Sequence, residues 1–183
     1  MAWLVLGLML WTGAHFFKRV LPVQRAAMGK AGRGLVALLI VAGIVLMVVG
    51  YRATDYVHLY DLPAGVWWLN NVLMLVALFL LDVGKAGVVR QHIRHPMLTA
   101  VVVWMAAHLL INGDLAALIL FGGLGLWALA EMVVLNHAEG PWEAPPPGTI
   151  ARDVRTAAIA VVLYALIVGA HYWFGFTVLA VMR

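Results

Sequence analysis

The stretch GLVALLIVAGIVLMVVGY, residues 34–51, decides the class of fold. It carries no charged side chain and is 18 residues long. At a helical rise of about 1.5 Å per residue, such a stretch approaches the roughly 30 Å thickness of the hydrocarbon core of a bilayer. This pattern is typical of a helix that crosses a membrane.

The composition of the whole chain agrees with this stretch. Of 183 residues, 65% are hydrophobic and 11% are charged, and the mean hydropathy is +0.99. Soluble domains carry about 25% charged residues, so this chain has too few to cover a soluble surface. The absence of cysteine excludes disulfides, thiolate metal sites and catalytic thiols. We therefore expect an all-α integral membrane protein with a single domain over residues 1–183.

Six apolar segments predict a bundle of six transmembrane helices. They are Ala2–Phe17, Gly34–Tyr51, Val66–Leu81, Met97–Ile111, Leu115–Leu135 and Thr156–Val181. The first, third and fourth are short, so we expect these helices to continue by about one turn into the flanking residues.

Two connections carry their own signals. In Asn112-Gly113-Asp114 we expect Asn-Gly to close one helix and Asp114 to cap the next. Residues 140–148, GPWEAPPPG, predict a stiff loop of polyproline type.

The placement of basic residues predicts the orientation. Ten of the twelve Lys and Arg residues lie in the connections after the first, third and fifth segments: Lys18, Arg19, Arg25, Lys30, Arg33, Lys85, Arg90, Arg94, Arg152 and Arg155. Positively charged loops stay in the cytoplasm, so both termini and the two remaining arginines are expected on the periplasmic side of a bacterial inner membrane. The pI near 9.8 then reflects topology and contact with the lipid bilayer, without a nucleic-acid partner.

Three of the seven histidines fall inside the apolar segments, where ionisable groups are costly and usually functional. His108 lies deepest, and the i, i+4 spacing places Trp104, His108 and Asn112 on one helix face. His171 lies at a similar depth in the last segment, and His15 follows Trp11 by one turn. Glu131 is the one carboxylate within an apolar segment. Asn70 and Asn71 are expected only to cap or to reach the interface.

Two interpretations of the embedded histidines stay open. An intramembrane histidine can bond a neighbouring helix. Alternatively, two imidazoles from different helices can hold a b-type haem. The sequence lacks Cys-x-x-Cys-His, which excludes covalent attachment of haem.

Two stretches, RHPML at residues 94–98 and WMAAHLLINGD at residues 104–114, resemble the NnrU family. Gly13-Ala14-His15 is similar to the opening helix of this family, which also contains the 15-cis-ζ-carotene isomerases. The resemblance covers roughly residues 1–135. It implies six helices and a link to denitrification and nitric-oxide metabolism. In the isomerase branch it implies a non-covalent haem b that supports cis–trans isomerisation of an apolar substrate.

Carried over by position, the resemblance makes His15 and His108 the expected iron ligands, with His171 in reserve. His95, Trp104 and Asn112 are then expected to position or tune the cofactor.

Two further functional hypotheses remain. Arg94-His95-Pro96 at the start of a segment also resembles integral-membrane methyltransferases of the isoprenylcysteine carboxyl type, in which it helps to bind S-adenosylmethionine. Four residues at the cytoplasmic end of the fifth segment lie on the same predicted side of the membrane as His95: Glu131, Asn136, His137 and Glu139. A third hypothesis is a non-enzymatic haem or assembly helper for a respiratory complex. The oligomeric state is not encoded in any motif.

Overall fold

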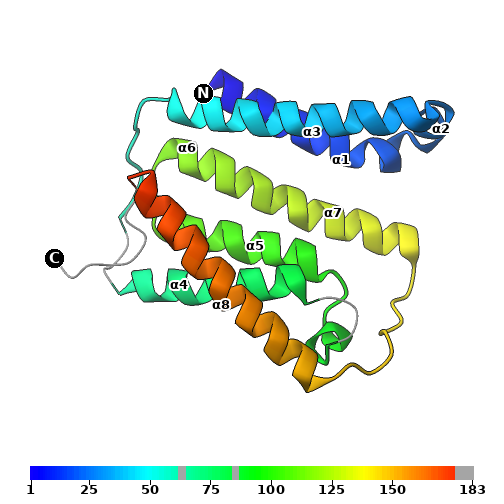
Figure 1. Cartoon of the computed structure of the whole chain (residues 1–183). Coiled ribbons are helices and arrows are strands. Elements are labelled where there is room, and N and C mark those ends of the chain that lie inside the picture. The colour runs from blue at the N-terminus through cyan, green and yellow to red at the C-terminus, as the bar shows by residue number, and fades with distance from the viewer. Residues whose placement is uncertain (62–64, 84–86, 176–183) are drawn as a thin grey trace. The chain divides into compact units, whose positions relative to one another are not determined.

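The computed structural model describes residues 1–61, 65–83 and 87–175. Within these ranges every regular element of secondary structure is a helix, as expected (Figure 1). The one pairing of β type in the described ranges is an isolated antiparallel bridge between His58 and Asp114.

Three helical stretches in the described part are long and apolar enough to cross a membrane. They are α3 (Gly29–Arg52), the run Leu115–Glu139 and α8 (Ile150–Trp173). The run Leu115–Glu139 comprises α6 (Leu115–Ala117), the π-helical turn η2 (Leu118–Gly122) and α7 (Gly123–Glu139). Two shorter apolar helices, α4 (Val66–Asp82) and α5 (Pro96–Leu109), hold 17 and 14 residues.

The helix bounds confirm the expected extra turn for the first segment only, since α1 runs from Ala2 to Val20. The same expectation for the third and fourth segments is wrong. Pro96 occupies the first turn of α5, and a residue before proline is disfavoured in the α region, so His95 has φ −123° and ψ 68° and the helix cannot begin earlier.

The last segment also differs from its prediction. Helix α8 begins at Ile150, six residues before Thr156, and ends at Trp173. Gly175 follows with φ 84°, a left-handed conformation that commonly terminates helices. His171 therefore lies in the last turn of α8. The predicted continuation to Val181 falls on residues 176–183, which lie outside the described residues.

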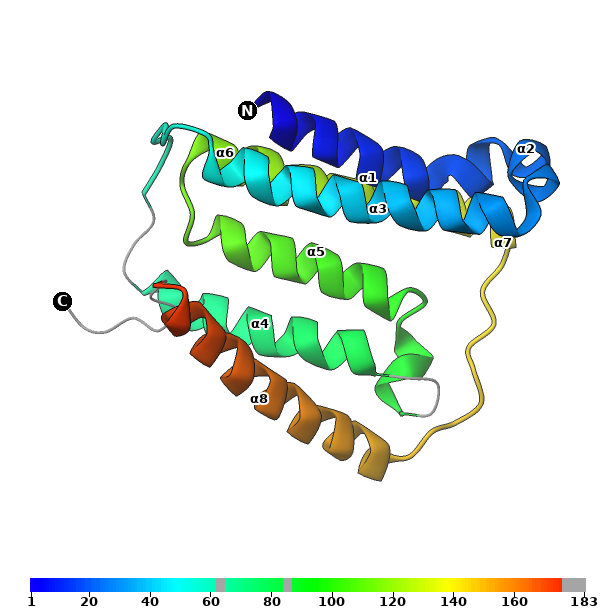
Figure 2. The same cartoon turned by 45° about the horizontal axis from the view of Figure 1, so that its top comes forward.

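The chain divides into two compact units, of which unit 1 comprises Met1–Tyr60 and Asn112–Trp127. Its centre is the side-by-side pair α1 and α3, joined by the short helix α2 (Pro22–Ala27) (Figure 2). Glycines allow this close approach. A Cβ on Gly7 would lie 2.6 Å from the amide nitrogen of Met47, and a Cβ on Gly50 would collide with the amide nitrogen of Leu4. Small residues at a helix contact let backbones approach in this way.

The Asn112-Gly113-Asp114 connection has a different role from the one predicted for its first two residues. Helix α5 ends at Leu109, so Asn-Gly does not close it. Instead, the Gly113 carbonyl accepts from the amides of Leu59 and Tyr60 at 2.8 and 3.1 Å. A Cβ on Gly113 would collide with the Tyr60 carbonyl, which explains the glycine. The predicted cap is confirmed, because Asp114 Oδ1 accepts from the amide of Ala117 at 2.9 Å.

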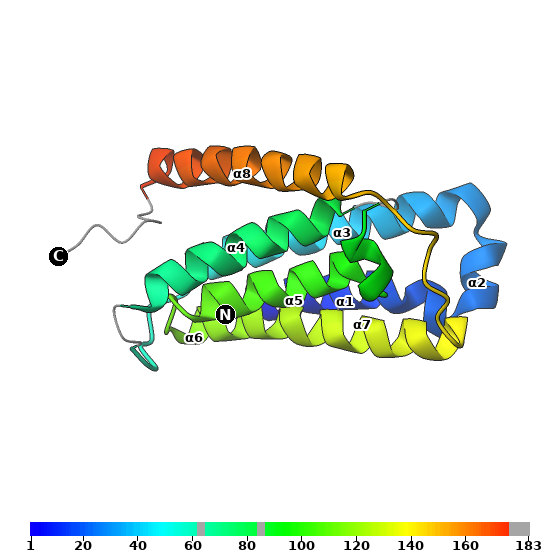
Figure 3. The same cartoon turned by 90° about the horizontal axis from the view of Figure 1, so that it is seen from below.

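Unit 2 comprises Asp61–Ile111 and Ala128–Arg183. In its described part, α4 packs against both α5 and α8 (Figure 3). The start of α8 is anchored by Asp153, whose Oδ2 accepts from the amides of Val88 and Val89 at 2.8 and 3.2 Å. Thr156 donates to the Asp82 carbonyl at 3.4 Å. These bonds hold the beginning of α8 beside the end of α4.

The 140–148 connection is confirmed as irregular, because helix α7 ends at Glu139 and α8 begins at Ile150. Gly140 at its start has φ 72°. Gln91 donates to the Pro145 carbonyl at 3.4 Å, which attaches this loop to unit 2.

Replacement of Gly50 tests the α1–α3 contact. We expect Gly50→Ala to destabilise the protein by about 1–3 kcal/mol, because the added methyl group overpacks against the Leu4 backbone. Gly34→Ala in the same helix meets nothing within 4 Å and is expected to be neutral or slightly stabilising. Thermal unfolding in detergent measures both, and equal melting temperatures for the two variants would contradict the contact.

Replacement of Asp153 tests the anchor of α8. Asp153→Ala leaves the partly buried amides of Val88 and Val89 without their acceptor, so we expect a loss of about 1–3 kcal/mol. Asp55→Ala, on an exposed turn, is the matched control. Denaturant unfolding followed by tryptophan fluorescence measures the difference, and an Asp153 variant as stable as the control would refute the anchor.

Candidate functional site

His15 and His108 share one local arrangement. In each case Nδ1–H donates to the backbone carbonyl of the tryptophan four residues earlier, Trp11 at 2.8 Å and Trp104 at 3.0 Å. A carbonyl only accepts, so Nδ1 carries the proton and, in the neutral ring, Nε2 carries the lone pair. This bond fixes the orientation of the ring and places a proton on Nδ1, as is common for histidines that bind metals through Nε2.

His171 has the same arrangement without the tryptophan. Its Nδ1–H donates to the Ile167 carbonyl at 2.8 Å. In all three histidines predicted to lie within apolar segments, Nδ1 therefore carries a proton and donates it to the carbonyl of the residue four positions earlier.

Aromatic rings surround His15 in unit 1. The His15 ring centroid lies 4.3 Å from that of Trp11 and 4.6 Å from that of Trp127, and the two tryptophans meet edge to face at 5.2 Å. The indole N–H groups of both tryptophans are buried and have no hydrogen-bond partner among the described residues. Buried donors usually find acceptors, so this cluster suits a ligand that carries acceptor atoms.

His108 and His171 line a common cavity in unit 2. Asn70 and Met74 of α4 and Tyr164, Ile167 and Val168 of α8 complete the lining. The cavity encloses about 30 Å³. A cavity needs about 10–15 Å³ of such space to hold one water molecule, so this cavity has room for a water-sized group and not for a porphyrin ring.

Asn70 is the residue of this cavity that sequence reasoning missed. It is only 1% exposed, so the expectation that it caps a helix or reaches the interface is wrong. Its amide nitrogen donates to Asn71 Oδ1 at 3.3 Å. The available signal was a polar side chain in the interior of an apolar segment, which marks a packed or functional position.

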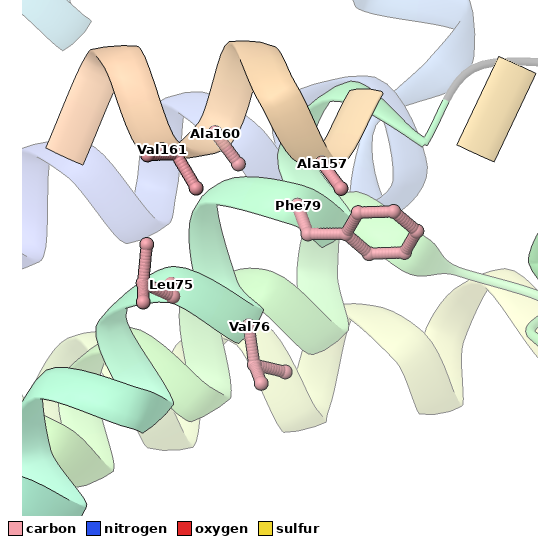
Figure 4. A pocket seen from close by; sticks show the side chains of 6 residues that line it. All are labelled: Leu75, Val76, Phe79, Ala157, Ala160 and Val161. Carbon is pink, nitrogen blue, oxygen red and sulfur yellow. The ribbon is translucent and has the colours of Figure 1, made fainter. Parts of the chain in front are cut away.

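A larger hollow in unit 2 lies between α4 and α8 and encloses about 250 Å³. Its lining is entirely apolar (Figure 4): Leu75, Val76, Phe79, Ala157, Ala160 and Val161. It offers packing space and no polar chemistry.

The family comparison covers nearly the whole chain, matching residues 3–178 to the family model described as NnrU protein. The chain belongs to the NnrU family. No curated protein and no solved structure matches it. The family match extends beyond residue 135, where the sequence resemblance ended, and includes α8 with His171.

In this NnrU-family chain the Arg94-His95-Pro96 motif meets the end of α7 within unit 2. His95 Nε2 lies 2.9 Å from Asn136 Oδ1, and Arg94 forms an ion pair with Glu139 at 3.5 Å. These are the same partners that the methyltransferase hypothesis groups together. Here they bond one another, which gives the motif a structural role in joining α5 to α7.

The predicted ligands and positioning residues are distributed over both units. His15 and Asn112 belong to unit 1, whereas His95, Trp104 and His108 belong to unit 2. Trp104 and His108 share a face of α5, with ring centroids 6.0 Å apart. Asn112 does not continue that face, because α5 ends three residues before it.

The donor chemistry of His15 and His108 fits haem iron, since both rings hold the tautomer that leaves Nε2 for a metal. The cavity shared by His108 and His171 does not fit a porphyrin between those two rings. The pair His15 and His108 stays a prediction.

Glu131 of α7 is buried, at 9% exposure, and its Oε2 has no hydrogen-bond partner among the described residues.

Proposed function

We propose that this NnrU-family chain is a six-span protein of the bacterial inner membrane, with both termini in the periplasm, that binds haem b non-covalently. His15 and His108 are the residues that would hold the haem iron. The proposed chemistry is haem-based redox, nitric-oxide-linked or cis–trans isomerase chemistry on an apolar substrate. The observation that carries the proposal is the repeated arrangement in which a tryptophan carbonyl accepts from Nδ1–H of the histidine one turn later.

The proposed count of six spans combines the three helical stretches that are long and apolar enough to cross a membrane with three further helices, α1, α4 and α5. Of the latter, α4 and α5 are apolar but short. A helix shorter than the hydrocarbon core is accommodated by local thinning of the bilayer or by flanking side chains that reach the interface. The distribution of basic residues supports the proposed orientation.

The residues of the chain would act by holding two neutral imidazoles in fixed orientations and by excluding water. Trp11 and Trp127 cover the His15 ring, and Trp104 lies edge-on to the His108 ring. Haem, when bound, supplies an iron centre for redox or Lewis-acid chemistry. The carbonyl bonds at Nδ1 would fix the ring orientation in which Nε2 is the nitrogen presented to iron.

Absorption spectroscopy tests the cofactor and its ligands. Protein expressed with adequate haem supply is expected to show a Soret band that is lost in His15→Ala and in His108→Ala, because each variant removes an axial ligand. His137→Ala, on the exposed last turn of α7, is the control and should retain the band.

Two spectroscopic outcomes would contradict this proposal. Colourless protein before any substitution would remove haem binding. A Soret band that is lost in His171→Ala and kept in His15→Ala would show that His171, and not His15, is an iron ligand. Size-exclusion profiles of the variants separate loss of haem from loss of fold.

Labelling of introduced cysteines tests the orientation, and the natural absence of cysteine makes single-site labelling clean. A membrane-impermeant maleimide added to cells with a permeabilised outer membrane should label Asp55→Cys and should label Ala144→Cys only after the inner membrane is opened. Both positions are exposed. If Ala144→Cys were labelled from the periplasm and Asp55→Cys only after the inner membrane is opened, the orientation would be the opposite of the one proposed. Labelling of both sites in intact inner membranes would contradict the span count.

A further inference from the structure

The small cavity of unit 2 holds two polar atoms whose hydrogen-bonding capacity is unused. Asn70 Oδ1 and the Tyr164 hydroxyl are both buried, and neither has a hydrogen-bond partner among the described residues. The amide nitrogen of Asn70 is already engaged with Asn71, so the oxygen is the end that lacks a partner. Both residues line the cavity.

The two atoms are chemically complementary. A carboxamide oxygen only accepts, whereas a phenolic hydroxyl also donates. A single O–H group between them would donate to Asn70 Oδ1 and accept from the Tyr164 hydroxyl. A carbonyl or ether oxygen would satisfy only Tyr164 and leave Asn70 unpaired.

The remaining lining selects for the same kind of ligand. Nδ1–H of His108 and of His171 already donates to a carbonyl of its own helix, so neither Nδ1–H serves a ligand in the cavity. Met74, Ile167 and Val168 are apolar. No carboxylate is among the residues that line the cavity, so an uncharged group suits it.

We propose that this cavity binds one hydroxylic oxygen, from water or from a lipid-soluble alcohol, between Asn70 Oδ1 and the Tyr164 hydroxyl. The volume of about 30 Å³ accommodates one such group. An alcohol would insert its hydroxyl and leave its hydrocarbon chain among the apolar helices. The proposal rests on Asn70 and Tyr164 and does not require haem.

The alcohol source is tested with three probes of matched chain length: 1-dodecanol, dodecyl methyl ether and dodecane. Binding to the detergent-solubilised full chain is followed by thermal unfolding at increasing probe concentration. If an alcohol is the source, we expect the alcohol to bind about tenfold more tightly than the ether or the alkane, since only the alcohol pairs with both atoms.

Two variants and one control make the assignment specific. Tyr164→Phe removes one oxygen atom, and Asn70→Leu removes the acceptor at similar size, so both should abolish the preference for the alcohol. Tyr172→Phe, on the same helix at 41% exposure and outside the cavity, should keep it. Tyr164→Phe should also keep any Soret band, which separates this site from haem binding.

The water source is tested by an experimental structure without added alcohol. Density for one ordered oxygen between Asn70 and Tyr164 that is lost in Tyr164→Phe identifies water, whether or not the alcohol displaces it. Preference for the alcohol without such density identifies the alcohol. Equal binding of the three probes, together with no density between the two side chains, overturns the proposal.

Discussion

A polar group surrounded by hydrocarbon has no water to bond with, and it must find its partner within the chain or in a ligand. This constraint explains the most regular feature of the described residues, the hydrogen bond from Nδ1–H of His15, His108 and His171 to a carbonyl one turn earlier. Each bond pairs Nδ1 with a carbonyl of the same helix, so Nε2 is the ring nitrogen that can contact other groups. The few polar groups that remain unsatisfied become the informative ones.

The same constraint shapes the backbone at its non-helical connection in unit 1. The segment around Val57–Tyr60 pairs with Gly113 and Leu115 through backbone hydrogen bonds, which satisfy the amides of Leu59 and Tyr60 and the carbonyl of Val57. Gly113 permits the close approach, and Asp114 caps the helix that follows. The Asn-Gly-Asp motif therefore supplies hydrogen-bond partners for backbone groups. Its spacing in the sequence predicts instead that Asn112 lies beside His108 on one helix face.

Local patterns predicted the features that depend on local chemistry. Apolar length predicted the helices, and the position of Asp114 predicted its cap. Predictions that required knowledge of distant neighbours were less successful. Asn70 appeared to be an interfacial side chain, because nothing near it in the sequence indicates that α8 covers it with Tyr164 and His171. The methyltransferase hypothesis placed Asn136 and Glu139 on the same side of the membrane as the RHP motif, but it did not predict that they bond its histidine and arginine directly.

The sequence by itself determined that this chain is helical, compatible with a membrane and a member of the NnrU family, because these properties follow from composition, the length of apolar runs and local motifs. Only the tertiary structure decided which polar side chains meet. It grouped His108 with His171, Asn70 and Tyr164, and His15 with Trp11 and Trp127. The physical reason is that helix packing brings together residues up to about a hundred positions apart, and helical periodicity specifies which face a residue occupies without specifying which helix will cover it.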